Sequence, residues 1–383
     1  MIEITREEAR AFLIEHLGLA RASFPDGAEG VRAVLRALRC IQLDPLDPIG
    51  TNADLVVLAR VDGISRGDVH RHLHPGHAFE HYAKERCLLP ADAFPTYRDH
   101  ALAWSKKSLQ NWLKRVPPKV LTLVLAEIEA RGPITPEALT QHGSIERIDW
   151  SGWKGTPFAT KMAVEILAAR CQIVVCGREG RSRKVYDVPR RALAHVADAK
   201  PERDFARFAI VERVRAAGLL GRNAGAHWSM LTDVRAGATP TELVDRGEIE
   251  AVTIEGHPRT FLAPKGFRST EHGDFDDRMR IIAPLDPLIW DRPLVRHVFE
   301  FEYVWEVYKP QSDRRWGWYV CPLLHRGRLV GRLEARIEPG VLCVQRLWRE
   351  RGARFDDDAL DAALERHARA CGVERVKRPR RPK

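Results

Sequence analysis

Apolar residues recur at helical spacing through the middle of the chain, and glycines follow several of these segments. The pattern predicts three successive helices, the first ending at Gly132, the second capped by Thr135 and the third capped by Thr156: PPKVLTLVLAEIEARG, ITPEALTQHG and TPFATKMAVEILAAR. Strand-forming residues follow in CQIVVCG and KVYDVP, and the glycines in and beside the loop REGRSR permit a tight reversal between them. The predicted order is helix, helix, helix, hairpin.

That order is typical of a winged helix, in which the third helix enters a groove of DNA and the hairpin, or wing, contacts the backbone. A second copy is predicted downstream. It comprises a helix ending at Gly218, a helix with a capping box from Thr239 to Glu242, and a hairpin that turns at Gly256. A third copy is predicted at the N-terminus, where Thr5 begins a capping box and the helix GVRAVLRALR runs into the extended stretch CIQLDPL.

The pattern changes to strands from about residue 280. FEYVWEVYKP, WGWYVCPLLH, RLVGRLEARIE and VLCVQRLWRE read as strands separated by turns, and DDDALDAALERHARACG reads as a closing helix with acidic residues at its positive end. We therefore predict an α+β fold, with tandem winged-helix (helix-turn-helix) domains followed by a C-terminal antiparallel β-domain. The predicted units are residues 1–115 (winged-helix-like), 116–200 (winged helix with a basic wing), 201–278 (winged helix), 279–373 (β-rich with the final helix) and 374–383 (a disordered basic tail).

Composition limits the class of protein. A chain of 383 residues exceeds one ordinary core, which agrees with several domains. Its 44% hydrophobic and 30% charged residues are typical of a soluble protein, and neither a membrane-spanning run nor a secretory signal is recognisable. The seven cysteines are scattered without a CxxC pair, so we interpret them as reduced thiols. We expect a cytoplasmic protein that associates with the nucleoid.

The positive charge is concentrated in two stretches. Residues 154–191 hold 9 Lys/Arg against 3 Asp/Glu, and residues 374–383 hold 6 against 1, whereas the net charge of the whole chain is +10. Concentrated charge suits a polyanion, so double-stranded DNA is the expected partner, although a solvated surface would also explain the tail. The expected DNA contacts are Lys154, Lys161, Arg178, Arg181, Arg183 and Lys184.

No nucleotide-binding GxxxxGK[ST] or GxGxxG, zinc-binding HExxH or nucleophile-elbow GxSxG motif is present, which disfavours the corresponding enzymes. The most suggestive stretch is CIQLDPLDPIG. In an extended chain Gln42 and Asp44 point to one side, and Pro45 disfavours helix at Asp44. One carboxylate can stabilise a sugar cation and deprotonate water during cleavage of an N-glycosidic bond. The alternative is that Asp44 only caps a turn.

These stretches resemble the winged-helix DNA glycosylase family related to AlkZ and YcaQ, also described as crosslink-repair glycosylases. The resemblance covers most of the chain and is carried by RCIQLDPLDPIG, FEHYAKERCLLP at 79–90, PLDPLIWDR at 284–292, FEYVWEVYKP and GWYVCPLLHRGRLVGRL. It implies three winged helices with a C-terminal β-domain and a catalytic Gln-x-Asp signature, in which Asp44 activates water and Gln42 assists. It also implies excision of N7-alkylpurines and unhooking of some interstrand crosslinks, without a cofactor.

One departure from the family concerns Lys84, which stands where the family usually has histidine. We expect it to contact DNA. An amine near an abasic sugar could instead form a Schiff base, but lysines are more often phosphate contacts or surface residues, so we predict a monofunctional enzyme.

Further residues admit more than one interpretation. The cluster His70, His72, His74, His77 and His81 lacks the partners of a known metal site, so no metal is predicted. Trp290, Trp305, Trp316 and Trp318 suit core packing better than base stacking. A winged-helix transcription regulator is the main alternative function, and a nuclease a weaker one. With no heptad seam, we expect a monomer.

Overall fold

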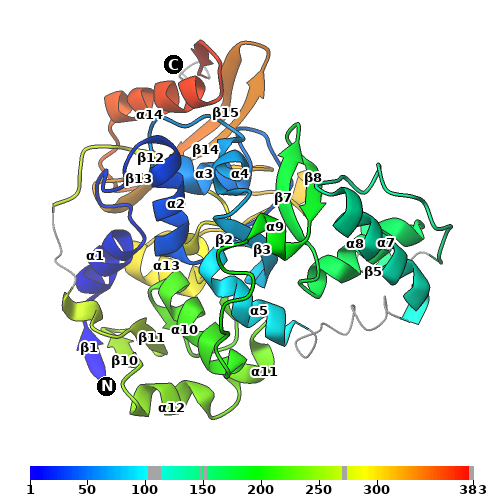
Figure 1. The fold of residues 1–383 in the computed structure, drawn as a ribbon. Coiled ribbons are helices and arrows are strands. Elements are labelled where there is room, and N and C mark those ends of the chain that lie inside the picture. The colour runs from blue at the N-terminus through cyan, green and yellow to red at the C-terminus, as the bar shows by residue number, and fades with distance from the viewer. Residues whose placement is uncertain (102–113, 147–148, 151–152, 155, 270–273, 379–383) are drawn as a thin grey trace. The chain divides into compact units, whose positions relative to one another are not determined.

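The structure is a computed structural model that describes residues 1–101, 114–146, 149–150, 153–154, 156–269 and 274–378 (Figure 1). The chain is a mixed α+β protein, as predicted, and it divides into two compact units. Unit 1 comprises Met1–Val69, Tyr82–Cys87 and Ala206–Lys383, and unit 2 comprises His70–His81 and Leu88–Phe205. The division into five segments and the three tandem winged helices stay predictions.

Unit 1 begins with helices whose ends follow local sequence signals. The predicted capping box is confirmed, because the Thr5 side chain accepts from Glu8 N and the Glu8 carboxylate accepts from Thr5 N. The predicted helix before the Gln-x-Asp stretch is also confirmed, and it ends at Arg39, which adopts the left-handed conformation (φ 57°). The elements are β1 (Ile2–Ile4), α1 (Arg6–His16), α2 (Gly27–Leu38), β2 (Ile41–Gln42) and α3 (Asn52–Leu58).

A four-stranded sheet ordered β1-β10-β11-β9 follows in unit 1. The predicted hairpin turning at Gly256 is confirmed. The predicted capping box at Thr239 is wrong, because Ala238 is the cap residue and Thr239 and Pro240 already lie in the first turn. The elements are α10 (Phe205–Ala217), β9 (Leu220–Gly221), α11 (Thr232–Arg235), α12 (Thr239–Asp245), β10 (Ile249–Ile254) and β11 (Thr260–Pro264).

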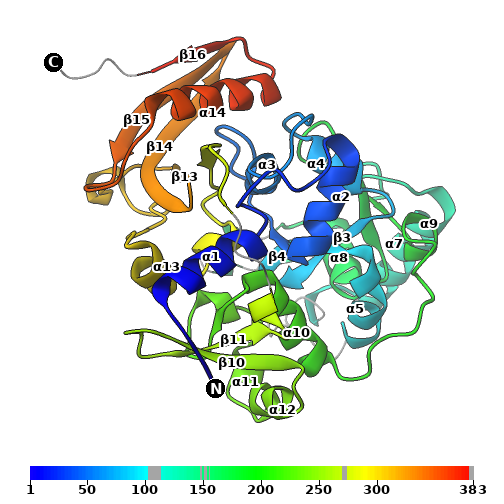
Figure 2. The same ribbon diagram turned by 90° about the vertical axis from the view of Figure 1, so that its left-hand side faces the viewer.

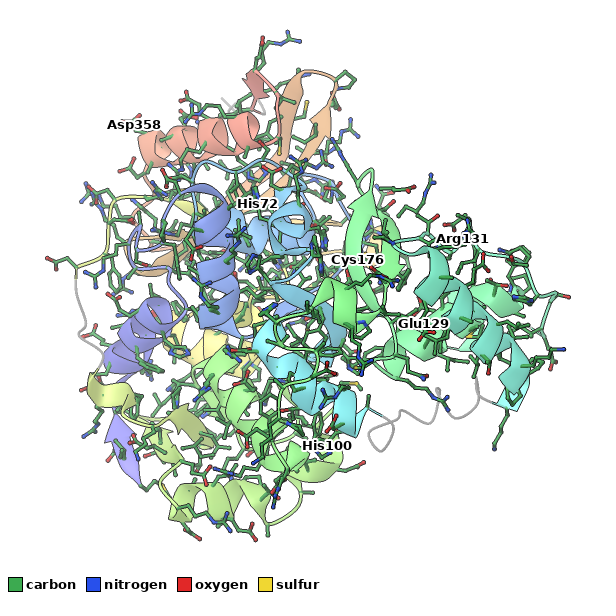
Figure 3. The ribbon with its side chains drawn as sticks, in the orientation of Figure 1. His72, His100, Glu129, Arg131, Cys176 and Asp358 are labelled. Carbon is green, nitrogen blue, oxygen red and sulfur yellow. The ribbon has the colours of Figure 1, made fainter. Side chains whose placement is uncertain are left out.

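The C-terminal part of unit 1 is a five-stranded sheet ordered β12-β13-β14-β15-β16, with α14 packed against it (Figure 2). Asp356 caps α14, and Asp358 lies in its first turn (Figure 3), so the predicted acidic helix start is confirmed. The elements are β12 (Arg280–Ile281), α13 (Arg292–Phe299), β13 (Val320–His325), β14 (Arg328–Glu338), β15 (Val341–Arg349), α14 (Asp357–Ala370) and β16 (Arg375–Lys377).

Two predictions for this part are wrong. FEYVWEVYKP forms no strand, because hydrogen bonds of its side chains, and not a ladder of backbone hydrogen bonds, hold it in place. The Glu306 carboxylate accepts from Arg315 N and Trp316 N, and the Tyr303 hydroxyl donates to Val320 O. The tail is not disordered throughout, because β16 pairs in parallel with β15. Residues 379–383 of the tail lie outside the described residues.

Unit 2 contains the predicted basic hairpin, which is confirmed as β7 (Val174–Glu179) and β8 (Arg183–Asp187). Its core lies between the apolar faces of α7 (Pro118–Arg131) and α8 (Ala159–Ala169). The remaining elements are α5 (Phe94–His100), β5 (Asp149–Trp150), β6 (Trp153–Lys154) and α9 (Pro189–Ala192). The chain passes between the two units within α4 (Asp68–Leu73), β3 (Ala78–Ala83) and β4 (Glu85–Pro90), and again at the first residue of α10.

The predicted helix ITPEALTQHG in unit 2 is wrong. Ile134 forms a bridge with Tyr186, and only one turn follows, closed by Ala138 N and Thr135 O. The Thr160 hydroxyl donates to Thr140 O and accepts from His142 N, which holds the segment away from helical geometry. Thr156 is not the cap of α8 either. It accepts from Phe158 N in a turn before the helix, and Phe158 is the cap residue.

No helix in the described part of the chain combines the length and the apolar content needed to cross a membrane. All seven cysteines are free, and six of them are buried.

A buried ion pair joins distant parts of unit 1. Arg60 Nη1 lies 2.8 Å from the Asp286 carboxylate, and neither side chain is exposed. Arg60 also donates to Leu17 O and Val56 O, and Asp286 accepts from Leu288 N. Because burying charge is costly, such a pair requires that its remaining donors and acceptors be satisfied, and here they are.

We expect Asp286→Asn to lower the free energy of unfolding of unit 1 by about 3 kcal/mol, because it leaves the buried Arg60 charge uncompensated. Urea denaturation followed by tryptophan fluorescence measures this loss. Arg6→Ala is the control, since Arg6 pairs with Glu300 at 4.0 Å on an exposed surface and should cost less than about 1 kcal/mol. Equal losses in the two variants would contradict the importance of the buried pair.

Candidate active site

Gln42 and Asp44 lie where a short strand of unit 1 gives way to an extended segment. Gln42 ends β2, and Leu43 N still donates to Arg86 O at 2.8 Å, so the chain remains extended through Leu43. Side chains two residues apart on an extended chain point to the same side. The expectation that Gln42 and Asp44 point to one side therefore agrees with the local backbone.

Gln42 is almost fully buried, with 8% of its surface exposed, and it is held at both ends. Its side-chain Oε1 accepts from Lys84 Nζ at 3.0 Å, and its backbone carbonyl accepts from Asn52 Nδ2 at 2.7 Å. Because an ammonium group has only donors, it requires the amide oxygen of Gln42 on its own side. The amide NH₂ of Gln42 is consequently directed away from Lys84 as a donor.

Asp44 is half-buried and begins a turn. Its Oδ1 accepts from Leu46 N at 3.0 Å across Pro45, which is the contact expected of a turn-capping aspartate. This single bond uses only part of the acceptor capacity of a carboxylate. Burial raises the pKa of Asp44 above its usual value, against the opposing effect of the Leu46 N–H. Turn capping and service as a base are therefore compatible.

Lys84 lies at the turn between β3 and β4, in the part of that hairpin that belongs to unit 1. Only 6% of its surface is exposed, and burial lowers the pKa of its amine. Its Nζ lies 5.4 Å from the centroid of the Trp290 ring. Lys84 is therefore part of the polar group around Gln42, and it is not a surface lysine. A direct contact between Lys84 and DNA stays a prediction.

A pocket of about 210 Å³ in unit 1 opens beside Lys84. Trp290 is fixed on its wall by a hydrogen bond from its indole N–H to Leu285 O at 2.9 Å. Asp291 accepts from Arg259 and caps α13 through Leu294 N. The pocket is lined by Lys84, Ala224–His227, Arg259, Pro284, Leu285 and Ile289–Pro293.

Asn52 and Trp290 are site residues that the sequence pattern does not reveal. Asn52 joins the Gln-x-Asp stretch to the PLDPLIWDR segment, because its Oδ1 accepts from Leu285 N at 3.0 Å while its Nδ2 binds Gln42 O. For Trp290 the pattern favours core packing over base stacking. A sequence signal exists in the PLDPLIWDR stretch, which contains Trp290 and also Leu285, the partner of Asn52. This stretch contributes to the family resemblance, but the resemblance assigns no role to its residues.

The predicted DNA contacts of unit 2 are largely paired with carboxylates. Arg178 and Lys184 both bind Glu80. Burial raises the pKa of Glu80, but the two cations together outweigh this effect and lower the pKa below its usual value. Arg183 pairs with Glu179 at 3.1 Å, and Lys161 pairs with Glu137 at 2.9 Å. Lys154 lies in β6, and Arg181 lies in the loop between β7 and β8.

His70, His74 and Glu80 of unit 2 bring three possible metal ligands within 4.8 Å of one another. Burial lowers the pKa of His70 to about 3 and that of His74 to about 4, so both rings are neutral. Arg178 and Lys184 already compensate Glu80, however, and these two cations would repel a divalent metal. The arrangement does not favour a metal site.

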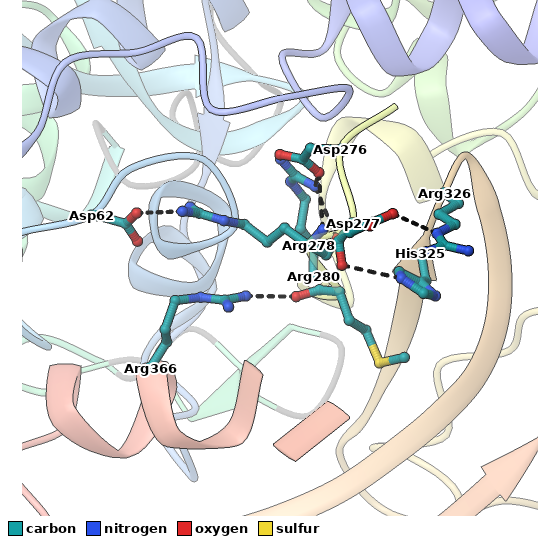
Figure 4. Close-up of polar contacts among 9 residues, drawn as sticks. Asp62, Asp276, Asp277, Arg278, Arg280, His325, Arg326 and Arg366 are labelled. Carbon is teal, nitrogen blue, oxygen red and sulfur yellow. Dashed lines mark hydrogen bonds and ion pairs between the residues drawn. The ribbon is translucent and has the colours of Figure 1, made fainter. Parts of the chain in front are cut away.

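A second cavity in unit 1, of about 450 Å³, has several arginines in its wall. Most of their charge is neutralised locally (Figure 4): Arg278 pairs with Asp62 and Arg280 pairs with Asp276. Arg366 donates to the backbone carbonyl of Met279. The smaller pocket is lined by Lys84, which donates to Gln42 Oε1, so we assign the chemistry to the pocket beside Lys84.

The aromatic residues of the C-terminal part mostly serve packing. The Arg332 guanidinium lies 4.1 Å from the Trp316 ring centroid and 4.0 Å from that of Phe301, and its carboxylate partner is Glu350. Trp318 is 37% exposed.

Comparisons with known proteins identify the fold and the family of the chain. The structure of a DNA glycosylase, AlkZ from Streptomyces sahachiroi, is similar over 99% of this chain and 100% of its own, with a TM-score of 0.64 and 17% sequence identity, which establishes a shared fold. The family model described as "DNA glycosylase AlkZ-like" matches residues 35–370, which include Gln42, Asp44, Lys84 and Trp290. The chain therefore belongs to the AlkZ-like family of DNA glycosylases, enzymes of DNA repair.

Proposed function

We propose that this glycosylase excises N7-alkylated purines from double-stranded DNA, with water as the nucleophile and Asp44 as the base. The observation that carries the proposal is the fixed Gln42 amide, two residues from a half-buried carboxylate of raised pKa. A transcription regulator, the alternative from the sequence, is not favoured, because a regulator requires neither feature and the chain belongs to a glycosylase family.

Excision develops positive charge on the sugar as the base departs. The Asp44 carboxylate stabilises that charge electrostatically and accepts a proton from the attacking water. Its raised pKa makes the ionised carboxylate a stronger base than an ordinary aspartate. The Gln42 NH₂, directed away from Lys84, donates to the oxygen of that water and orients it.

The leaving group determines which lesions suit this site. An N7-alkylated purine is already cationic, so its departure needs no strong general acid. The same reaction at a purine joined through N7 to the opposite strand would unhook a crosslink, and we include such lesions in the proposed substrate class. The excision step uses no enzyme nucleophile, so its first product is an intact abasic site, as expected of monofunctional hydrolysis.

The basic residues of unit 2 supply affinity for the DNA backbone in this proposal. Exposed ion pairs such as Arg183 with Glu179 are worth little and exchange readily for phosphate. Arg181 adds a positive charge in the loop of the same wing, and Lys154 and Lys161 are further cations of unit 2. We assign these side chains sequence-independent contacts, and we expect the protein to act as a monomer near the nucleoid.

We expect Asp44→Asn to abolish release of 7-methylguanine from methylated duplex DNA while binding to the same duplex persists, because the amide cannot accept the proton of water. High-performance liquid chromatography of the released base, with fluorescence anisotropy for binding, measures both. Loss of binding in parallel with release would instead assign Asp44 to DNA recognition.

The pH dependence gives an independent check of the same residue. Release by the wild type should fall as the pH drops through the pKa of Asp44, which lies above 3.8, because only the ionised carboxylate is a base. A rate that stays constant down to the usual aspartate range would count against Asp44 as the base.

We expect Asn52→Ala to lower excision by roughly 10- to 100-fold, because the Gln42 carbonyl and Leu285 N–H lose their shared partner and the Gln-x-Asp stretch shifts. The free energy of unfolding should fall by about 2 kcal/mol. Gln172→Ala, which removes an amide from an exposed position, is the control for excision and stability. Unchanged excision despite the loss of stability would separate Asn52 from the site.

We expect the double variant Arg181→Ala/Arg183→Ala to lower the salt dependence of DNA binding. The slope of log K against log salt should fall by about 2, since each phosphate that the protein no longer neutralises reduces it by about 0.9. Binding titrations across salt concentrations measure the slope. Arg181→Lys/Arg183→Lys, which keeps the charge, should keep the slope. Weaker binding confined to one DNA sequence would point to base recognition by the wing.

A further inference from the structure

Lys84 has surroundings that the excision reaction alone does not require. A cation that only contacted phosphate would lie on the surface, yet only 6% of the surface of Lys84 is exposed. Its Nζ is fixed 3.0 Å from Gln42 Oε1 and 5.4 Å from the centroid of the Trp290 ring, and the side chain lines the pocket beside them. One premise on which a monofunctional enzyme was predicted, a lysine on the surface, does not hold.

We propose that Lys84 gives the protein a second activity, in which its Nζ forms a Schiff base with C1′ of an abasic sugar and the DNA strand is cleaved on the 3′ side. This proposal rests on the proposed function, because excision at Gln42 and Asp44 would produce the abasic sugar beside Lys84. It departs from the monofunctional enzyme that the sequence predicts.

The pocket can admit the sugar once the base has left. Its volume of about 210 Å³ corresponds to about seven water molecules at about 30 Å³ each. Trp290 and Ile289 supply an apolar wall, and Lys84 supplies the amine. A carbonyl carbon that enters this pocket therefore meets the amine of an almost fully buried lysine, and desolvation is a condition that activates lysine nucleophiles.

The chemistry needs a neutral amine, and the surroundings of Lys84 favour one. Burial lowers the pKa of Lys84, and the nearby Arg213 guanidinium also lowers it, although the Cys87 thiol acts in the opposite direction. A neutral amine keeps two N–H donors and gains a lone pair. One N–H can still bind Gln42 Oε1, which leaves the lone pair available to the pocket.

The reaction is balanced without an oxidant, a reductant or a metal. The lone pair of Lys84 Nζ bonds to C1′ of the ring-opened abasic aldehyde, which gives a carbinolamine. The carbinolamine takes one proton from solvent and loses its hydroxyl group as water, which leaves a protonated imine. The imine makes the C2′ proton acidic. Loss of that proton to solvent moves an electron pair into the C2′–C3′ bond, and the C3′–O bond breaks as the 3′ phosphate leaves with its electrons. Water then hydrolyses the imine and restores Lys84.

The test uses a duplex with a preformed abasic site, so it does not depend on base excision. Sodium borohydride reduces an imine to a stable amine and so joins the protein covalently to labelled DNA. The wild-type protein should give this crosslinked product, and peptide mapping by mass spectrometry should locate the adduct on Lys84. An adduct on another lysine, or no crosslinked product, would overturn the proposal.

Matched variants provide a second readout. Lys84→Arg keeps the positive charge but offers no nucleophilic amine, so crosslinking and strand cleavage should both be lost, whereas Lys265→Gln, at an exposed position after β11, should retain them. Duplex binding and circular dichroism of Lys84→Arg show whether the variant is folded. Retained crosslinking in folded Lys84→Arg would overturn the proposal.

Release of 7-methylguanine, measured in parallel, separates the two proposals. Release without crosslinking would overturn the Schiff-base activity and leave the excision proposal intact. Crosslinking on Lys84 without release of any alkylated base would support the strand-cleaving activity and overturn the proposed substrate class.

Discussion

The buried pair between Arg60 and Asp286 is the constraint from which the site geometry follows. Two charges without solvent exposure are tolerated only when their hydrogen-bonding groups are satisfied, and Arg60 meets this requirement by binding Leu17 O, Val56 O and both oxygens of Asp286. The pair therefore ties the end of α1 and the helix α3 to a segment more than 200 residues later in the chain. That segment, PLDPLIWDR, provides much of the pocket wall.

From this anchor the geometry extends to the reacting groups through short, buried hydrogen bonds. Leu285, next to Asp286, donates its N–H to Asn52 and accepts the Trp290 indole N–H on its carbonyl. Asn52 in turn binds the carbonyl of Gln42. Each of these groups would lose the energy of a buried hydrogen bond if it moved, so the pocket wall and the Gln-x-Asp stretch are held in one arrangement. This is the preorganisation that a glycosylase needs.

Local signals in the sequence predicted the elements whose stability is local. The capping box at Thr5, the helix that ends at Gly132 and both hairpins depend on residues close in the chain, and all are confirmed. ITPEALTQHG and FEYVWEVYKP were predicted wrongly because distant partners decide their conformation: Tyr186 and Thr160 for the first, Arg315, Trp316 and Val320 for the second.

The residues of the candidate site likewise divide into those that the local sequence reveals and those that depend on distant packing. Gln42 and Asp44 could be singled out because alternation along an extended chain and the proline after Asp44 are local facts. The burial of Lys84 and the linking role of Asn52 could not be predicted, because each depends on packing between segments remote in sequence. The consequence was largest for Lys84, whose role depends on its solvent exposure and so could not be read from residue type.

The burial of Lys84 matters to both proposed reactions. A positive ammonium beside the Gln-x-Asp stretch would oppose the positive charge that develops on the sugar during excision, since like charges repel and the effect is strong where water is excluded. Burial lowers the pKa of Lys84 and so weakens that opposition. The same shift favours the neutral amine, whose lone pair attacks the abasic aldehyde in the proposed cleavage. Excision and strand cleavage therefore make the same electrostatic demand on Lys84, and the hydrogen bond to Gln42 can be retained through both.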